Sequence, residues 1–178
     1  MYHSISDCQK LNPLGRLSFS SAQFRTHLSY LRKNRFECIT LDELYRRAVK
    51  GEIDNKRIAV ITFDDGFLDN LTVAQPILED FGFKGTVFVN PDRISPQKPN
   101  RQANKTHWGQ LSYPELIEME NNGVMSIQSH TMTHDFLFRC DKVIDFYSPQ
   151  KYSKYYWLGN LLFPEDKPNW MNKIEEQK

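Results

Sequence analysis

Two short segments of the chain carry residue types that together bind divalent metals and activate water. Thr62-Phe63-Asp64-Asp65-Gly66 contains two adjacent carboxylates, and Ser129-His130-Thr131-Met132-Thr133-His134 contains two imidazoles. Two buried neighbouring carboxylates are unfavourable unless a cation or hydrogen bonds compensate them. The spacing of His130 and His134 places both rings on one face if the segment forms a helical turn. Imidazole nitrogen with carboxylate oxygen suits zinc, and by ligand type also cobalt, nickel or iron.

Both segments follow a stretch that is typical of a strand. Residues 58–63 are apolar and rich in β-branched side chains, and residues 124–128 form a second run of strand length. Asp64 and Asp65 are therefore expected at the carboxyl end of a strand. Adjacent residues of an extended chain point to opposite sides, so the two carboxylates can share a site only if the backbone turns sharply. Gly66 permits such a turn.

Each segment taken alone has an ordinary structural interpretation. Asp-Asp-Gly after a strand is commonly a solvated turn, and a single histidine in a loop is commonly an exposed side chain. The two motifs together, in a chain with five histidines, favour a metal site. Asp69 is predicted to be a solvated residue in the first turn of the next helix, where negative charge is favourable.

The two motifs, in this order and at this separation, resemble the polysaccharide deacetylase family, whose members share the NodB homology domain. The resemblance covers roughly residues 1 to 135. It implies that Asp64 is the catalytic base and that Asp65, His130 and His134 bind the metal. It also implies a distorted β/α barrel and hydrolysis of N-acetyl groups on the amino sugars of a polysaccharide or glycan.

The chain departs from this family after its histidine motif. Members usually carry an arginine-proline segment, then a tryptophan-containing segment, and then a leucine-x-x-histidine whose imidazole serves as the acid. None of these is recognisable here, because no histidine follows His134 and Arg139 has no proline after it. We expect the later motifs to fall beyond residue 178, which makes the barrel incomplete.

The elements that would position the two motifs alternate between helix and strand. Apolar spacing and capping residues predict helices at 22–35, 41–50, 67–81 and 113–122, and strands at 36–40, 57–63, 84–90 and 124–128. Pro76 lies inside the third helix, so a kink or a restart is expected there. This order predicts an α/β fold with a parallel sheet, in which both motifs lie at the carboxyl ends of strands.

Other parts of the chain leave alternatives open. Residues 91–106 are expected to form an exposed loop. The aromatic-rich stretch 141–178 is expected to be an insertion or a truncated C-terminal part of one domain that spans 1–178. Its tyrosines and tryptophans either stack on sugar rings or pack on the barrel, and packing is the favoured interpretation, as it is for Trp108. His3 is a weak candidate for a residue near the site.

Composition limits the classes of partner. The 178 residues are 39% hydrophobic with a formal net charge of +1, which fits one globular domain and gives no sign of a nucleic-acid or acidic-membrane partner. Cys8, Cys38 and Cys140 are too few and too irregular for a disulfide framework or a cysteine zinc site. No apolar run reaches transmembrane length, and no signal peptide is visible. Residues 1–5 resemble the tail of the family's first barrel strand, so we expect this chain to be an excised domain.

Three functional hypotheses follow. The first is a metal-dependent hydrolase that removes N-acetyl groups from a polysaccharide, with zinc as the expected metal. The second is a non-catalytic glycan-binding domain that retains the metal, for which the absent acid histidine argues. The third is hydrolysis of another non-peptide carbon–nitrogen bond on the same fold. The resemblance implies a cell-envelope or extracytoplasmic location, with the cytoplasm left open, and the oligomeric state is not indicated.

Overall fold

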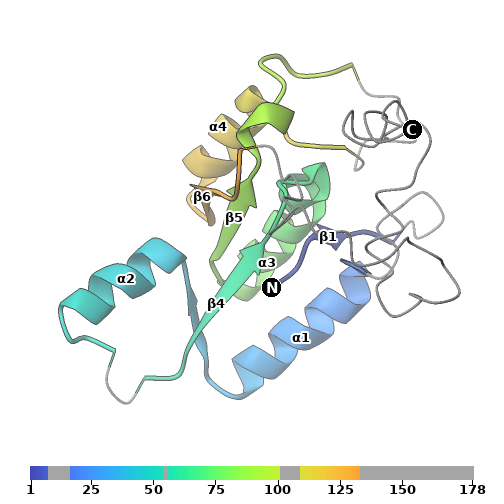
Figure 1. Cartoon of the computed structure of the whole chain (residues 1–178). Helices are drawn as coiled ribbons and strands as arrows, with labels where there is room; N and C mark the ends of the chain where they lie inside the picture. Colours follow the sequence, from blue (N-terminus) through green and yellow to red (C-terminus); the bar gives the residue numbers. More distant parts are fainter. Residues whose placement is uncertain (8–16, 54–55, 101–108, 133–178) are drawn as a thin grey trace, which may run out of the picture. The chain divides into compact units, whose positions relative to one another are not determined.

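Helices and parallel strands alternate along the chain in the computed structural model (Figure 1), which describes residues 1–7, 17–53, 56–100 and 109–132. The strands are β1 (Ser4–Ile5), β2 (Ser18–Phe19), β3 (Glu37–Ile39), β4 (Ile58–Phe63), β5 (Gly85–Val89) and β6 (Met125–Ser129). The helical segments are α1 (Ser21–Lys33), α2 (Leu41–Val49), η3 (Asn70–Ala74), α3 (Gln75–Phe81), η4 (Pro91–Arg93) and α4 (Tyr113–Asn122). The predicted α/β alternation is therefore confirmed over these residues.

Four of the strands form one parallel sheet in the order β3-β4-β5-β6. β4 pairs with β3 along its first half, from Ile58, and with β5 along its second half, up to Phe63. β5 pairs with β6 over its whole length. The sheet curls, and within the described residues it forms half of a β/α barrel, as expected for an incomplete barrel of the deacetylase type (Figure 1).

The N-terminal segment joins the sheet at the end of β4. β1 pairs in parallel with β2, and Tyr2 forms a parallel bridge with Phe63. The Tyr2 and Phe63 rings stack with centroids 5.6 Å apart, and the Phe24 ring of α1 lies edge-on to both. The Lys84 N–H, just before β5, donates to the Cys38 carbonyl of β3 at 3.1 Å, so β3 and β5 follow one another along one side of β4, and the N-terminal segment pairs with the other side.

The helix boundaries carry the capping interactions that are common at helix ends. Ser20 caps α1 and Ser112 caps α4, each in a capping box, and Gly82 and Gly123 end α3 and α4 in the left-handed conformation. The interruption expected at Pro76 takes the form of a restart. A π-helical segment, η3, precedes α3, so the missing N–H of Pro76 falls in the first turn of α3, where no helical bond is required.

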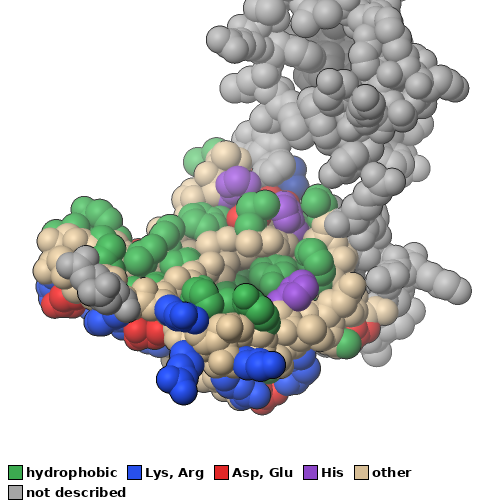
Figure 2. Space-filling view, turned by 90° about the horizontal axis from the view of Figure 1, so that it is seen from below, with side chains coloured by type: hydrophobic (Ala, Val, Ile, Leu, Met, Phe, Trp, Pro, Cys, Tyr) green, Lys and Arg blue, Asp and Glu red, His purple; other side chains and the backbone are tan. Residues whose placement is uncertain are grey.

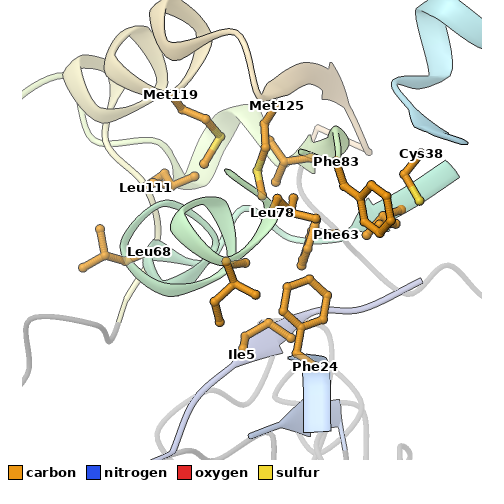
Figure 3. Close-up of a cluster of buried hydrophobic side chains, with 14 of the residues drawn as sticks. Ile5, Phe24, Cys38, Phe63, Leu68, Leu78, Phe83, Leu111, Met119 and Met125 are labelled. Atoms are coloured by element: carbon orange, nitrogen blue, oxygen red, sulfur yellow. The ribbon is translucent and has the colours of Figure 1, made fainter. Parts of the chain in front are cut away.

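The hydrophobic core lies between the sheet and its covering helices (Figure 3). Phe63 of β4 and Met125 of β6 point into it from the sheet, and Leu78 of α3 and Met119 of α4 meet them there. Because side chains alternate along a strand, Thr62, Thr86 and Ser126 belong to the opposite, inner face of the curled sheet. The outer face therefore holds the sheet and helices together.

The prediction that Asp69 is solvated is wrong. Its side chain is 1% exposed, because the chain turns inward before η3 and places the carboxylate against β1. The Ser4 hydroxyl and the Ile5 backbone N–H donate hydrogen bonds to it, but burial dominates and raises the pKa of Asp69 to about 7. Asp69 is thus a buried polar link between the N-terminal strand and the segment that follows the aspartate motif.

Several expectations concern residues outside those described. These are the aromatic-rich stretch 141–178, the cysteines Cys8 and Cys140, Trp108 and most of the second half of the 91–106 loop. The single-domain assignment of 1–178 stays a prediction for the same reason. Cys38 is a buried free thiol, and burial raises its pKa to about 11. None of the helices among the described residues is both long and apolar enough to cross a bilayer.

Candidate functional site

The aspartate motif forms a sharp turn directly after β4. Asp65 has φ 71° and Gly66 has φ 64°, so the backbone is left-handed at both residues. An aspartate rarely adopts this conformation, and the sequence pointed only to Gly66 for the turn. A Cβ on Gly66 would lie 2.8 Å from Cγ1 of Val89, so glycine is required there for space as well as for φ. The turn buries Asp65, which is 8% exposed, and leaves Asp64 half-buried.

A second segment, Gly109–Leu111, holds this turn from the outside. The Leu68 N–H donates to the Gly109 carbonyl at 2.7 Å, and the Leu111 N–H donates to the Gly66 carbonyl at 2.9 Å. With the Gln110 amide oriented so that its nitrogen faces the turn, it donates to the carbonyl oxygens of Asp65 and Gly66, the latter at 3.1 Å. Hydrogen bonds to both residues stabilise the left-handed pair and fix the backbone of Asp65.

The histidine motif begins at the end of β6, and its backbone is held by the end of β5. The His130 N–H donates to the Val89 carbonyl at 2.9 Å, which extends the pairing of the two strands by one residue. The Asn90 amide then donates to the backbone and hydroxyl oxygens of Thr131, both at 3.3 Å. These contacts place His130 at the same edge of the sheet as Asp65.

The structure brings Asp65 and His130 together. Their side chains approach to 3.8 Å between Oδ1 of Asp65 and Nε2 of His130. The Asp65 side chain is 11% exposed and that of His130 is 31% exposed, so the pair is accessible from one side. On the face drawn in Figure 2, histidine side chains lie next to acidic side chains.

The fourth predicted residue, His134, lies outside the described residues. Among the residues that the structure does describe, no group of three or more histidine, cysteine, aspartate or glutamate side chains is placed to hold a metal ion. The described part of the site therefore contains two of the three expected ligands. The residue expected to be the base, Asp64, precedes Asp65 in the chain.

The N-terminal segment fixes the backbone of Asp64. The Asp64 N–H donates to the Tyr2 carbonyl at 2.9 Å, and the Tyr2 N–H donates to the Thr62 carbonyl at 2.8 Å. His3 and Asp64 are the next residues after the bridged pair Tyr2 and Phe63. His3, a weak candidate from the sequence, therefore lies beside Asp64 on the adjacent, parallel segment.

Sequence reasoning missed the two amides that hold the motifs. Asn90 carried one usable signal, because it is the polar residue that ends an apolar strand between the two strands bearing the motifs. Gln110 carried none, since it contacts the aspartate turn only through tertiary pairing of distant segments.

Comparisons with known proteins agree with this arrangement. The sequence model of the polysaccharide deacetylase family matches residues 51–155, which include both motifs. The Bacillus subtilis (strain 168) protein YxkH, whose name places it among polysaccharide deacetylases, is 30% identical over 134 residues, which are 75% of this chain and 42% of YxkH. The chain thus spans less than half the length of this curated relative.

Two solved structures share the fold. The Streptococcus pyogenes deacetylase PplD in complex with acetate is 25% identical, with a TM-score of 0.59 over 79% of this chain and 58% of that protein. IcaB from Ammonifex degensii is 23% identical, with a TM-score of 0.57 over 74% of this chain and 51% of that protein. The family match over more than half of the chain, together with the half-barrel and its two motifs, shows that this chain belongs to the polysaccharide deacetylase family.

Proposed function

We propose that this chain carries the metal-binding and base-bearing half of a metal-dependent deacetylase that removes N-acetyl groups from the amino sugars of a polysaccharide or glycan. The observation that carries the proposal is the approach of Oδ1 of Asp65 and Nε2 of His130 to 3.8 Å, next to Asp64. Membership of the polysaccharide deacetylase family supports the substrate class.

The residues present fit a divalent metal. Zinc lies about 2.0–2.2 Å from carboxylate oxygen and imidazole nitrogen, so a single ion can contact two donor atoms that are 3.8 Å apart. Oxygen and nitrogen donors favour zinc, with cobalt, nickel and iron compatible by ligand type. We assign Asp65 and His130 as ligands and His134 as the third, which leaves an open position for catalysis.

The proposed reaction is hydrolysis of an amide, which converts the N-acetyl group and water into acetate and a free amine. The metal, when bound, supplies Lewis acidity that polarises the acyl oxygen and makes water a better nucleophile. Asp64 takes the proton from the attacking water as the general base. The backbone of Asp64 is held by the hydrogen bond from its N–H to Tyr2 and by the turn at Asp65 and Gly66. The base is therefore preorganised next to the ligand, which lowers the entropy cost of the reaction.

The proposal predicts that acetate release depends on Asp64. We expect the Asp64→Asn variant of the whole protein to release acetate from N-acetylglucosamine oligomers about 10²-fold to 10⁴-fold more slowly, because the amide keeps the size of the side chain but cannot accept the proton. Coupled detection of acetate measures the rate. The control is Asp80→Asn, which removes an equivalent charge from an exposed ion pair on α3 and should leave the rate unchanged.

Two outcomes would contradict the proposal. Full activity in the Asp64→Asn variant would remove Asp64 from the role of base. Absence of acetate release by the metal-loaded whole protein from every N-acetylated glycan tested would reject the deacetylase function, and tight binding of those glycans without turnover would favour the non-catalytic binding domain.

A further inference from the structure

Asn90 is buried at the centre of the candidate site, although the proposed mechanism gives it no role. It follows β5, the strand that lies between the strand carrying the aspartates and the strand carrying His130. Its side chain is 1% exposed. A buried carboxamide is unfavourable unless it is hydrogen-bonded, so the partners of Asn90 indicate what it does.

The donors of Asn90 go to the residue that follows His130. Its amide nitrogen lies 3.3 Å from the Thr131 carbonyl oxygen and 3.3 Å from the Thr131 hydroxyl oxygen. The backbone on either side of Thr131 is tied to the same segment, since His130 N–H donates to Val89 at 2.9 Å and Asp92 N–H donates to Met132 at 3.3 Å. Three successive residues of the histidine motif are thus attached to residues 89–92, at the end of β5 and in η4.

The link through Asn90 differs from the other two because it is made by a side chain. The backbone bonds of His130 and Met132 persist with any residue at position 90 that keeps the same backbone. Asn90 therefore adds, between these two backbone bonds, a side-chain contact to both oxygens of Thr131, the residue next to His130. The position of Thr131 relative to β5 is therefore the feature that the Asn90 amide can fix.

We propose that Asn90 is a positioning residue for the metal site, which holds Thr131 so that the neighbouring His130 meets Asp65 in a geometry ready for the ion. This role rests on the proposed function, because it presumes that the motif binds a metal. Groups that orient metal ligands commonly change metal affinity by about 10-fold to 100-fold when they are removed.

The test is zinc affinity of the 178-residue chain carrying Asn90→Leu. Leucine is close to asparagine in size and removes both donors. The Asn90 carboxamide oxygen has no hydrogen-bond partner among the described residues, so the substitution also removes a buried unsatisfied acceptor and should leave the chain folded. We expect the zinc dissociation constant, measured by competition with a chelator, to rise about tenfold.

Two further variants separate positioning from general destabilisation. Ile77→Ala opens a cavity in the core on α3, away from the strand ends, and should lower stability without changing the zinc dissociation constant. Thr131→Val keeps the backbone acceptor of the Asn90 amide and removes the hydroxyl acceptor on an exposed residue, so it should fold and raise the constant by a smaller factor than Asn90→Leu.

The outcomes distinguish this inference from the proposed function. If the wild-type chain binds zinc and the dissociation constants of both Asn90→Leu and Thr131→Val lie within twofold of its value, the positioning role is overturned. The metal site then stays in place. An equal loss of affinity in Ile77→Ala overturns it as well, since the effect would then reflect stability alone. A wild-type chain that binds no divalent metal overturns the metal site and this role together.

Discussion

Asp65 and Gly66 form two consecutive left-handed residues, with φ values of 71° and 64°, at the point where the proposed ligand leaves β4. We expect Gly66→Ala to destabilise the chain by about 2 kcal/mol or more, because a Cβ in left-handed backbone costs roughly 1–2 kcal/mol and this one would also lie 2.8 Å from Cγ1 of Val89. Gly51→Ala is the matched control, since Gly51 has φ 69° and a Cβ there would meet no atom of the described residues within 4 Å. Urea unfolding measures the free energy of unfolding of both variants. An equal decrease in the two would contradict a contribution from the close approach to Val89.

Asp69 couples the stability of the fold to pH. Burial raises its pKa to about 7 from an ordinary value of 3.8, so between these values the folded chain binds a proton that the unfolded chain does not. The contribution of Asp69 to the free energy of unfolding is then fully present below about pH 4. It falls by up to about 1.4 kcal/mol per pH unit as the pH rises towards 7, and it stops changing above that pH.

The variant Asp69→Asn should lack this slope, because an amide cannot titrate. Denaturant unfolding of both proteins at several values between pH 4 and 8 isolates the contribution, since all other groups are shared. An identical pH dependence in the variant would show that Asp69 does not titrate in this range.

At the scale of elements, the N-terminal strand fixes the end of β4 from one side. The Asn70 amide donates to the His3 carbonyl at 2.8 Å and to Asp69 at 3.1 Å, while Tyr2 accepts from the Asp64 N–H at 2.9 Å. Asn70 therefore ties down the strand that holds the backbone of the proposed base.

We expect Asn70→Ala to loosen this strand and to raise the hydrogen-exchange rate of the Asp64 amide by about tenfold, which corresponds to the loss of roughly one hydrogen bond. Amide exchange followed by NMR measures this. Asn122→Ala, at the exposed end of α4, should leave the rate unchanged. Equal protection of Asp64 in wild type and Asn70→Ala would mean that the strand is held without Asn70.

The elements that could be predicted are those whose signals are local. Ser20 and Ser112 mark helix starts through capping boxes, and Gly123 marks a helix end, so α1 and α4 were predictable to within a residue or two. The π-helical segment before Pro76 and the burial of Asp69 were not. Both depend on how the chain packs against β1, which no pattern within that segment encodes.

At the scale of the whole molecule, the sequence predicted both motifs at one edge of a parallel sheet, and the structure brings Asp65 and His130 to 3.8 Å there. That much was predictable because carboxyl ends of parallel strands meet at one edge of a sheet. The hydrogen bonds that hold the two motifs were not predictable. Gln110 and Asn90 make them to residues far away in the sequence, and these segments meet only in the folded chain. The half-barrel and the family match support this edge of the sheet as the site of the proposed chemistry.

The most direct test of the account is the zinc content of the metal-loaded 178-residue chain. The account predicts one zinc ion per chain for the wild type, loss of that ion in Asp65→Ala and in His130→Ala, and retention in Asp80→Asn, with circular dichroism showing that all four remain folded. A wild-type chain that binds no zinc, or variants of Asp65 and His130 that both retain it, would contradict the assignment of this pair as the metal site.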